Sequence, residues 1–141
     1  MKNIQDLKDR AVLLGWIAGL LLLISLIWIF SQPLQAHYLL RAVNYVFINN
    51  NDERRIISYI KKKPGKTDLM GYWYTMYNTK DNMFVFTVFK DGILVPFGAI
   101  VSDNGNVNEI IPLSAHAVQI FDDIQQGILQ MYVRQIEKTA L

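Results

Sequence analysis

Residues 83–89 read MFVFTVF, and this stretch decides the fold that the sequence predicts. Aromatic and β-branched side chains favour strands, and an antiparallel strand with one solvated face should alternate apolar with polar residues. Only Thr87 is polar here, so both faces of the strand are expected to be buried.

Three further strands are predicted around it, in residues 69–77, 93–101 and 107–113, which read LMGYWYTMY, ILVPFGAIV and VNEIIPL. Turn residues separate these stretches, among them Asp91 and Gly92, and Asn104 and Gly105, which supply the positive φ angles that tight hairpins need. The pattern predicts a four-stranded antiparallel meander. Pro96 cannot donate a ladder hydrogen bond, so a bulge or an edge position is expected there.

Large aromatic side chains are concentrated in the first two strands, and both faces of each strand carry apolar residues. Either two helical layers of the same chain cover the sheet, or a partner protein covers one face. Clustered Tyr and Trp favour interface cores. The residues predicted for a partner interface are Tyr72, Trp73, Tyr74, Phe84 and Phe86.

A C-terminal helix is predicted from Ser114, a good N-cap, and it should cover one face of the sheet. Its apolar residues recur every three or four positions, at Val118, Phe121, Ile124, Ile128, Tyr132 and Ile136. Gly127 lowers helix stability by about 1 kcal/mol relative to alanine, so it marks a kink, a close contact or a break into two helices.

The segment before the strands is predicted to be helical. In residues 35–48 the apolar side chains expected on one helical face are Tyr38, Leu39, Ala42, Tyr45 and Val46. A second short helix is predicted within residues 49–63, with Asn50 as its cap, Glu53 reaching back to the cap amide, and isoleucines on one side.

The N-terminal part contains a membrane-spanning pattern. No Asp, Glu, Lys or Arg lies between Arg10 and Arg41, and the 20 residues of 11–30 are apolar apart from two glycines and Ser25. As a helix they would extend about 30 Å, the thickness of a bilayer core. A signal-peptide core has about 7–15 apolar residues, so an uncleaved anchor is favoured over a signal peptide.

Three features refine this prediction. Trp16 and Trp28 lie near the two ends of the segment, as belt residues or as contacts of partner helices, and Pro33 follows where the helix bends or begins anew. Gly15 and Gly19 form a small-xxx-small pair that lets another membrane helix approach closely. They are the predicted helix-docking residues.

Positive charges predict the orientation. Lys2, Lys8 and Arg10 flank one end of the segment and only Arg41 lies close to the other, which places the N-terminus in the cytoplasm. The expected division is a cytoplasmic N-terminus (1–10), a transmembrane helix (11–31), a helical stalk and connector (32–67), and a sheet with its C-terminal helix (68–141). The predicted fold class is α+β, in an extracytoplasmic or periplasmic domain anchored to the inner membrane.

The sequence offers little for catalysis. It has no cysteine, and neither His37 nor His116 has metal-ligand spacing, so no catalytic, metal or cofactor site is predicted. Ser114 and His116 are explained by a helix cap and first turn. Asp122 and Asp123 would point about 100° apart on a helix and cannot share a proton. A net charge of +2, with both signs spread along the chain, argues against nucleic-acid binding.

One basic cluster is present, comprising Arg54, Arg55, Lys61, Lys62, Lys63 and Lys66. It is either the solvated C-terminal end of a helix, stopped by the Pro-Gly pair that follows, or a contact for anionic headgroups or an acidic partner.

Together these observations predict a non-enzymatic, single-pass accessory or scaffold subunit of a larger membrane protein complex. Its expected partners are other membrane subunits and the lipid bilayer, with homo-oligomerisation left open. The alternative is a membrane-anchored sensor or binding module that holds a small apolar or lipid ligand between sheet and helix. A membrane-bound enzyme is a third reading, disfavoured because acid, base and metal residues do not cluster.

Overall fold

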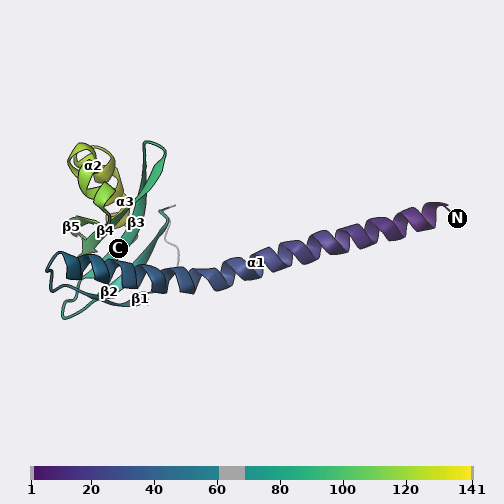
Figure 1. Cartoon of the computed structure of the whole chain (residues 1–141), viewed down its shortest axis with the longest axis horizontal. Coiled ribbons are helices and arrows are strands. Elements are labelled where there is room, and N and C mark those ends of the chain that lie inside the picture. The colour runs from purple at the N-terminus through teal and green to yellow at the C-terminus, as the bar shows by residue number, and fades with distance from the viewer. Residues whose placement is uncertain (1, 61–68, 141) are drawn as a thin grey trace. The chain divides into compact units, whose positions relative to one another are not determined.

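A computed structural model describes the backbone of residues 2–60 and 69–140. The elements in chain order are α1 (Lys2–Asn49), β1 (Ile56–Ile60), β2 (Gly71–Met76), β3 (Asn82–Lys90), β4 (Ile93–Val101), β5 (Val107–Pro112), α2 (Ala115–Gln125) and α3 (Ile128–Ala140) (Figure 1). The chain divides into two compact units, Met1–Gln35 and Ala36–Leu141. The last part of α1 therefore belongs to the globular unit, and the boundary lies past the predicted end of the membrane segment at residue 31.

The globular unit is α+β, as predicted, and its sheet is an antiparallel meander of five strands in the order β1-β2-β3-β4-β5. The four predicted strands correspond to β2–β5. The hairpin between β3 and β4 turns at Asp91 (φ 53°) and Gly92 (φ 82°), which confirms the predicted two-residue turn. In the next turn only Gly105 has a positive φ, 84°, and Asn104 does not.

The fifth strand, β1, corrects the prediction of a second short helix. The residues expected to cap that helix instead end α1: Asn51 adopts φ 54°, its N–H donates to the Ile48 carbonyl, and the Asp52 N–H donates to that of Phe47. The isoleucine-rich residues after them are β-branched and extend beside β2. A C-terminal cap and an N-terminal cap use the same residue types, so the sequence pattern did not separate them.

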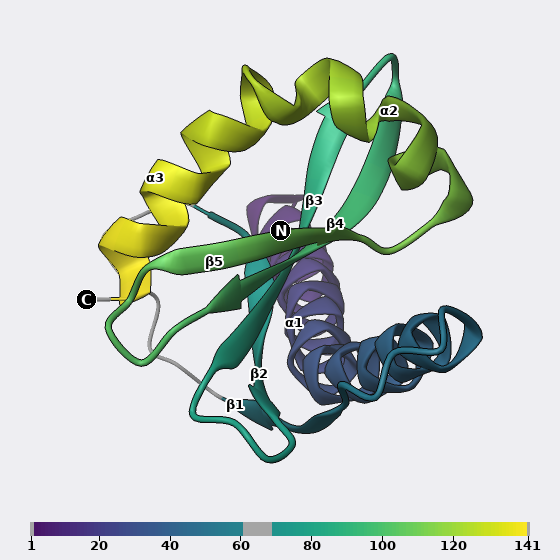
Figure 2. The ribbon, with the colours of Figure 1, turned by 90° about the vertical axis from the view of Figure 1, so that its left-hand side faces the viewer.

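Helices of the chain itself cover both faces of the sheet (Figure 2). On one face α2 and α3 pack against a core that includes Trp73, Phe84, Phe86 and Phe97. On the other face, Val43 and Phe47 of α1 pack with Tyr74 and Met83 among others. The burial of both faces of β3 that its sequence predicts is therefore achieved within one chain.

The C-terminal helix is two helices, as one of the three readings of Gly127 predicted. The Ser114 hydroxyl accepts a hydrogen bond from the Ala117 N–H at 3.1 Å, which confirms the predicted cap of α2. The break falls between Gln125 and Ile128. Pro96 lies in an interior strand, so neither predicted alternative describes it: the register shift of β4 is at Ile100 and Val101, and the Pro96 carbonyl still accepts a hydrogen bond from the Leu113 N–H at 3.1 Å, just beyond the stretch paired with β5.

The predicted apolar face of residues 35–48 requires correction. The residues that α1 buries against the sheet are Ala36, Val43 and Phe47, whereas Tyr38 is 75% exposed and Tyr45 is 64% exposed. Apolar residues lie on two sides of this helix, so periodicity alone did not identify the side that packs. Pro33 lies inside α1 rather than at a helix boundary, because a proline removes only one backbone bond of a long helix.

Candidate functional site

The aromatic residues predicted for a partner interface lie inside the domain. Trp73, Tyr74, Phe84 and Phe86 are all buried, and only Tyr72 is partly exposed. Trp73, Phe84 and Phe86 belong to the core beneath α2 and α3, and Tyr74 to the core beneath α1. The alternative of two intramolecular helical layers therefore accounts for them, and four of the five residues are not available on the surface of the folded domain.

These side chains form two ring clusters. The Phe86 ring stacks on Phe84, Phe97 and Tyr132, with centroid separations of 5.9, 6.2 and 5.2 Å. On the opposite face the Tyr59 ring lies 5.9 Å from Tyr72. The rings around Phe86 fill the layer between the sheet and α3, which is the space where the alternative function would place an apolar ligand. Tyr59 is 39% exposed and fills no such layer.

Two polar contacts fasten α1 to the sheet. The Tyr74 hydroxyl donates to the Ala36 carbonyl at 2.8 Å, and burial raises the pKa of this hydroxyl. The Asn44 amide donates to the Ile56 carbonyl and accepts from the Ile56 N–H, both at 2.9 Å. Asn44 thus satisfies the backbone of the first residue of β1, as a neighbouring strand would.

The basic cluster is only partly described. Lys61, Lys62, Lys63 and Lys66 lie outside the described residues. Arg55 is exposed, whereas the Arg54 guanidinium contacts the Asp52 carboxylate at 2.6 Å and the Glu109 carboxylate at 2.5 Å. Its Cζ also lies 5.7 Å from the centre of the Phe47 ring. Arg54 is therefore engaged in joining the end of α1 to β5.

The Arg54 pair predicts a pH dependence of stability. Hydrogen bonds from Arg54 lower the pKa of Asp52 below its ordinary value of 3.8. The stabilisation is thus complete above the ordinary pKa and is lost as pH falls through the lower folded-state pKa. Because the Arg54 side chain is 35% exposed, we expect this ion pair to contribute only about 1 kcal/mol to the free energy of unfolding. When urea unfolding is measured between about pH 5 and pH 2, the free energy of unfolding should fall less for Asp52→Asn than for the parent as the pH is lowered. An equal fall in the two proteins would contradict this prediction.

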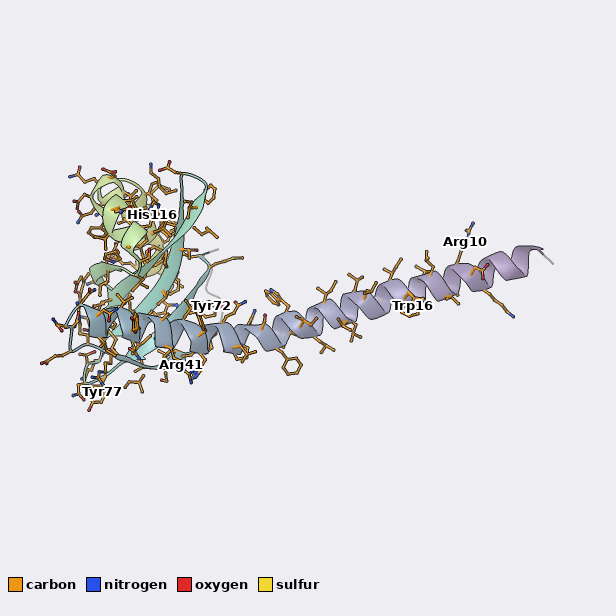
Figure 3. All side chains as sticks on the ribbon, viewed as in Figure 1. Arg10, Trp16, Arg41, Tyr72, Tyr77 and His116 are labelled. Atoms are coloured by element: carbon orange, nitrogen blue, oxygen red, sulfur yellow. The ribbon has the colours of Figure 1, made fainter. Side chains whose placement is uncertain are left out.

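The residues considered for chemistry do not assemble. His37 and His116 are exposed, and Figure 3 shows His116 on α2. Among the described residues, no three His, Cys, Asp or Glu side chains are grouped to hold a metal ion. Ser114 is used as a helix cap, and Asp122 and Asp123 are exposed on α2.

The apolar part of α1 is exposed. Of the described helices, α1 alone is long and apolar enough to cross a membrane, judged by length and composition. Gly15 and Gly19 line a shallow hollow of about 420 Å³ with Val12, Trp16, Leu20 and Leu23. A Cβ atom added at either glycine would meet no atom within 4 Å, so this side of the helix has room for a close neighbour. Trp16, labelled on α1 in Figure 3, is one of the residues that line this hollow.

The sequence patterns did not indicate a second hollow, of about 570 Å³, between β5, α2 and α3. We call it the β5 groove. Its apolar residues are Val107, Ile110, Phe121, Leu129 and Val133, and its polar residues are Asn108, Glu109, Gln125 and Gln130. These residues come from three elements whose arrangement depends on the break at Gly127, so only the tertiary structure brings them together.

Comparison of the chain with protein-family models, curated proteins and solved structures found no match. The function is therefore argued from the geometry of α1 and of the globular unit.

Proposed function

We propose that this chain is a non-enzymatic, single-pass accessory or scaffold subunit of a larger membrane protein complex. The observation that carries the proposal is the length of α1 and its apolar composition, with large apolar side chains exposed along it. A fully apolar helix surface of this length is stable in a lipid bilayer or against other membrane helices. It is costly in water, where contiguous apolar patches of this size are rare.

The orientation belongs to the same proposal. Lys2, Lys8 and Arg10 precede the apolar segment, and only Arg41 follows it closely. By the positive-inside rule the N-terminus lies in the cytoplasm and the globular unit lies outside the inner membrane. Homo-oligomers and hetero-complexes are both compatible with this arrangement.

Contacts with other subunits are proposed for two surfaces. The first is the hollow at Gly15 and Gly19, where a second helix could approach closely. The second is the surface of the globular unit outside its two cores, because the sheet faces are already covered. The exposed tyrosines Tyr38 and Tyr45 of α1 lie on that surface, and exposed aromatic residues are enriched in interfaces.

The membrane-anchored ligand-binding module is the second candidate. The β5 groove favours it, because 570 Å³ is within the volume range of small-molecule pockets. The groove is open and partly polar, however, and the stacked rings occupy the interior where an apolar ligand was expected. These two observations favour the subunit over the ligand-binding module.

The proposed function predicts the result of replacing both glycines. Gly15→Leu with Gly19→Leu fills the hollow, so we expect membrane insertion to persist and copurification of partner proteins in mild detergent to fall at least about tenfold, the equivalent of about 1.4 kcal/mol. Quantitative mass spectrometry of the affinity-purified chain measures this.

Ala18→Leu with Ser25→Leu is the matched control, because it adds two leucines to the same helix at positions that do not line the hollow. Equal copurification by all three proteins would refute docking at the glycines. A parent chain that is a clean monomer with no bound protein would refute the subunit itself.

A further inference from the structure

The hairpin formed by β3 and β4 ends as a two-stranded tip. Among the described residues, the pairing of β2 with β3 stops at Phe86, and the segment after β5 bonds β4 as far as the Pro96 carbonyl. Beyond these residues β3 and β4 pair with each other, as far as Lys90 with Ile93. Figure 1 shows the hairpin projecting from the sheet. We call residues 89–94 the β3–β4 tip.

The β3–β4 tip exposes three large apolar side chains. Phe89 is 65% exposed, Leu94 is 64% exposed and Ile93 is 53% exposed. Phe89 pairs with Leu94, so these two side chains share one face of the hairpin, and Ile93 lies on the other face. Val88 and Val95, one pair further in, are buried in the core beneath α2 and α3. Single exposed apolar residues are ordinary, but three together mark a contact surface.

The turns at the opposite end of the sheet have a different composition. Residues 77–81, between β2 and β3, read YNTKD, and residues 102–106, between β4 and β5, read SDNGN. Both turns are polar apart from Tyr77. A meander places these two turns at one end of the sheet and the β3–β4 tip at the other. Met70, which directly precedes β2 at the tip end, is 90% exposed. Exposed apolar side chains are therefore concentrated at the tip end.

Charge at the tip end is compatible with a lipid surface. Lys90 and Asp91, the two charged residues of the tip, form an ion pair at 3.8 Å, so the tip itself is neutral. The segment that joins Ile60 of β1 to Leu69 of β2 at this end carries four lysines and one aspartate in the sequence. That segment lies outside the described residues and forms no part of the site. Its excess of positive charge favours anionic headgroups.

The lipid bilayer is a surface within reach of the tip. The globular unit begins at Ala36, six residues after Phe30, the last residue of the apolar segment. Six residues of helix extend about 9 Å, so an α1 anchored in the bilayer keeps the globular unit close to the membrane surface whatever the angle between the two units. Such tethering raises the effective concentration of the tip at the bilayer, so a few apolar side chains suffice for contact.

We propose that the β3–β4 tip inserts into the interface of the bilayer that α1 spans, and that the globular unit is thereby bound to the membrane at a second point. Phe89, Ile93 and Leu94 enter the boundary between headgroups and acyl chains, which lies about 5–10 Å deep. The Lys90 stem packs beside them while its ammonium group stays at the headgroups. This inference rests on the anchoring of α1 in the proposed function and is independent of partner subunits.

The test uses the absence of cysteine from the chain. A single cysteine, introduced as Leu94→Cys, is labelled with the environment-sensitive fluorophore NBD. Tyr77→Cys is the matched control, because Tyr77 is 55% exposed at the opposite end of the sheet. The full-length chains are reconstituted into vesicles of phosphatidylethanolamine and phosphatidylglycerol. We expect blue-shifted emission at position 94, and quenching by spin-labelled lipid at least about threefold stronger than at position 77.

A double substitution tests whether the apolar side chains of the tip cause this burial. Phe89→Ser with Ile93→Ser, added to Leu94→Cys, changes two exposed residues, so the circular dichroism spectrum should stay that of the parent. Lipid quenching at position 94 should fall to the level of position 77. Unchanged quenching in this variant would overturn the inference, as would equal quenching at positions 94 and 77 without it.

Two further results would assign the tip to a protein contact and overturn the inference. The first is burial of position 94 that disappears when the protein-to-lipid ratio is lowered tenfold, which indicates contact between two copies of this chain. The second is burial of position 94 in native membrane vesicles but not in the pure lipid vesicles, which indicates another protein.

Alkaline carbonate extraction of the reconstituted vesicles separates this inference from the proposed function. A chain that stays in the vesicles with position 94 in water would overturn insertion of the tip and leave the anchored subunit standing. A chain that carbonate removes would contradict both. Lipid burial of position 94, in a chain that brings no protein with it from native membranes, would support the tip and contradict the complex.

Discussion

Phe86→Ala is expected to lower the free energy of unfolding by about 3–5 kcal/mol, the usual cost of removing a buried phenylalanine. Phe86 is 2% exposed, and its ring stacks on three other aromatic rings between the sheet and α3. Alanine would leave a cavity that the rigid strand and its neighbours cannot close. Urea unfolding of the full chain in micelles, followed by near-ultraviolet circular dichroism, measures the change.

Phe89 of the same strand provides the control. Its side chain is 65% exposed near the β3–β4 turn, so Phe89→Ala should change the unfolding free energy by no more than about 0.5 kcal/mol. The comparison separates a core residue from an interface residue. If Phe86→Ala were as stable as Phe89→Ala but lost copurifying proteins, the interface reading of the aromatic residues would be restored.

Asn44→Ala should cost about 2–4 kcal/mol, because it removes both hydrogen bonds to Ile56. The Ile56 residue is only 2% exposed, so its N–H and carbonyl would lose their partner at 2.9 Å without gaining water. A buried backbone group left unsatisfied costs about 1–3 kcal/mol. We expect β1 to separate from α1 before the rest of the sheet unfolds.

Amide hydrogen exchange, measured separately for each strand, tests this expectation. Amides of β1 should exchange faster in Asn44→Ala, while those of β3 and β4 change less. Asn49→Ala, an exposed asparagine at the end of the same helix, should leave exchange in β1 unchanged. Equal protection of β1 in the parent and Asn44→Ala would mean that strand pairing with β2 alone holds this edge.

Local chemistry was sufficient to predict several elements. Strands β2–β5 follow from short aromatic and β-branched stretches, the β3–β4 turn from Asp91 and Gly92, and the start of α2 from Ser114. Each of these depends on side chains within a few residues of one another, so the chain needs no distant contact to specify it. The same holds for the apolar length of α1, which follows from composition alone.

The misassigned elements depend on distant residues. The asparagines at 49–51 are compatible with either end of a helix. The strand that follows them, β1, is bonded at its first residue, Ile56, by the side chain of Asn44, twelve residues earlier. The side of α1 that packs was ambiguous because large side chains with apolar rings, Tyr38 and Tyr45, lie on one side of the helix while Val43 and Phe47 lie on the side that the sheet buries. In both cases the competing local patterns are equal in strength, and tertiary packing decides between them.

For this protein the sequence by itself determined an α+β chain with an apolar N-terminal helix, and a meander in which the strands of residues 69–77 and 83–89 carry apolar residues on both faces. It offered no arrangement of residues that predicts catalysis. Only the tertiary structure decided what buries those faces, because apolar surface is satisfied equally by its own helices or by a partner. It also placed β5 at an open edge beside α2 and α3. A groove of this kind arises where separate elements meet, so its residues share no local pattern that the sequence could display.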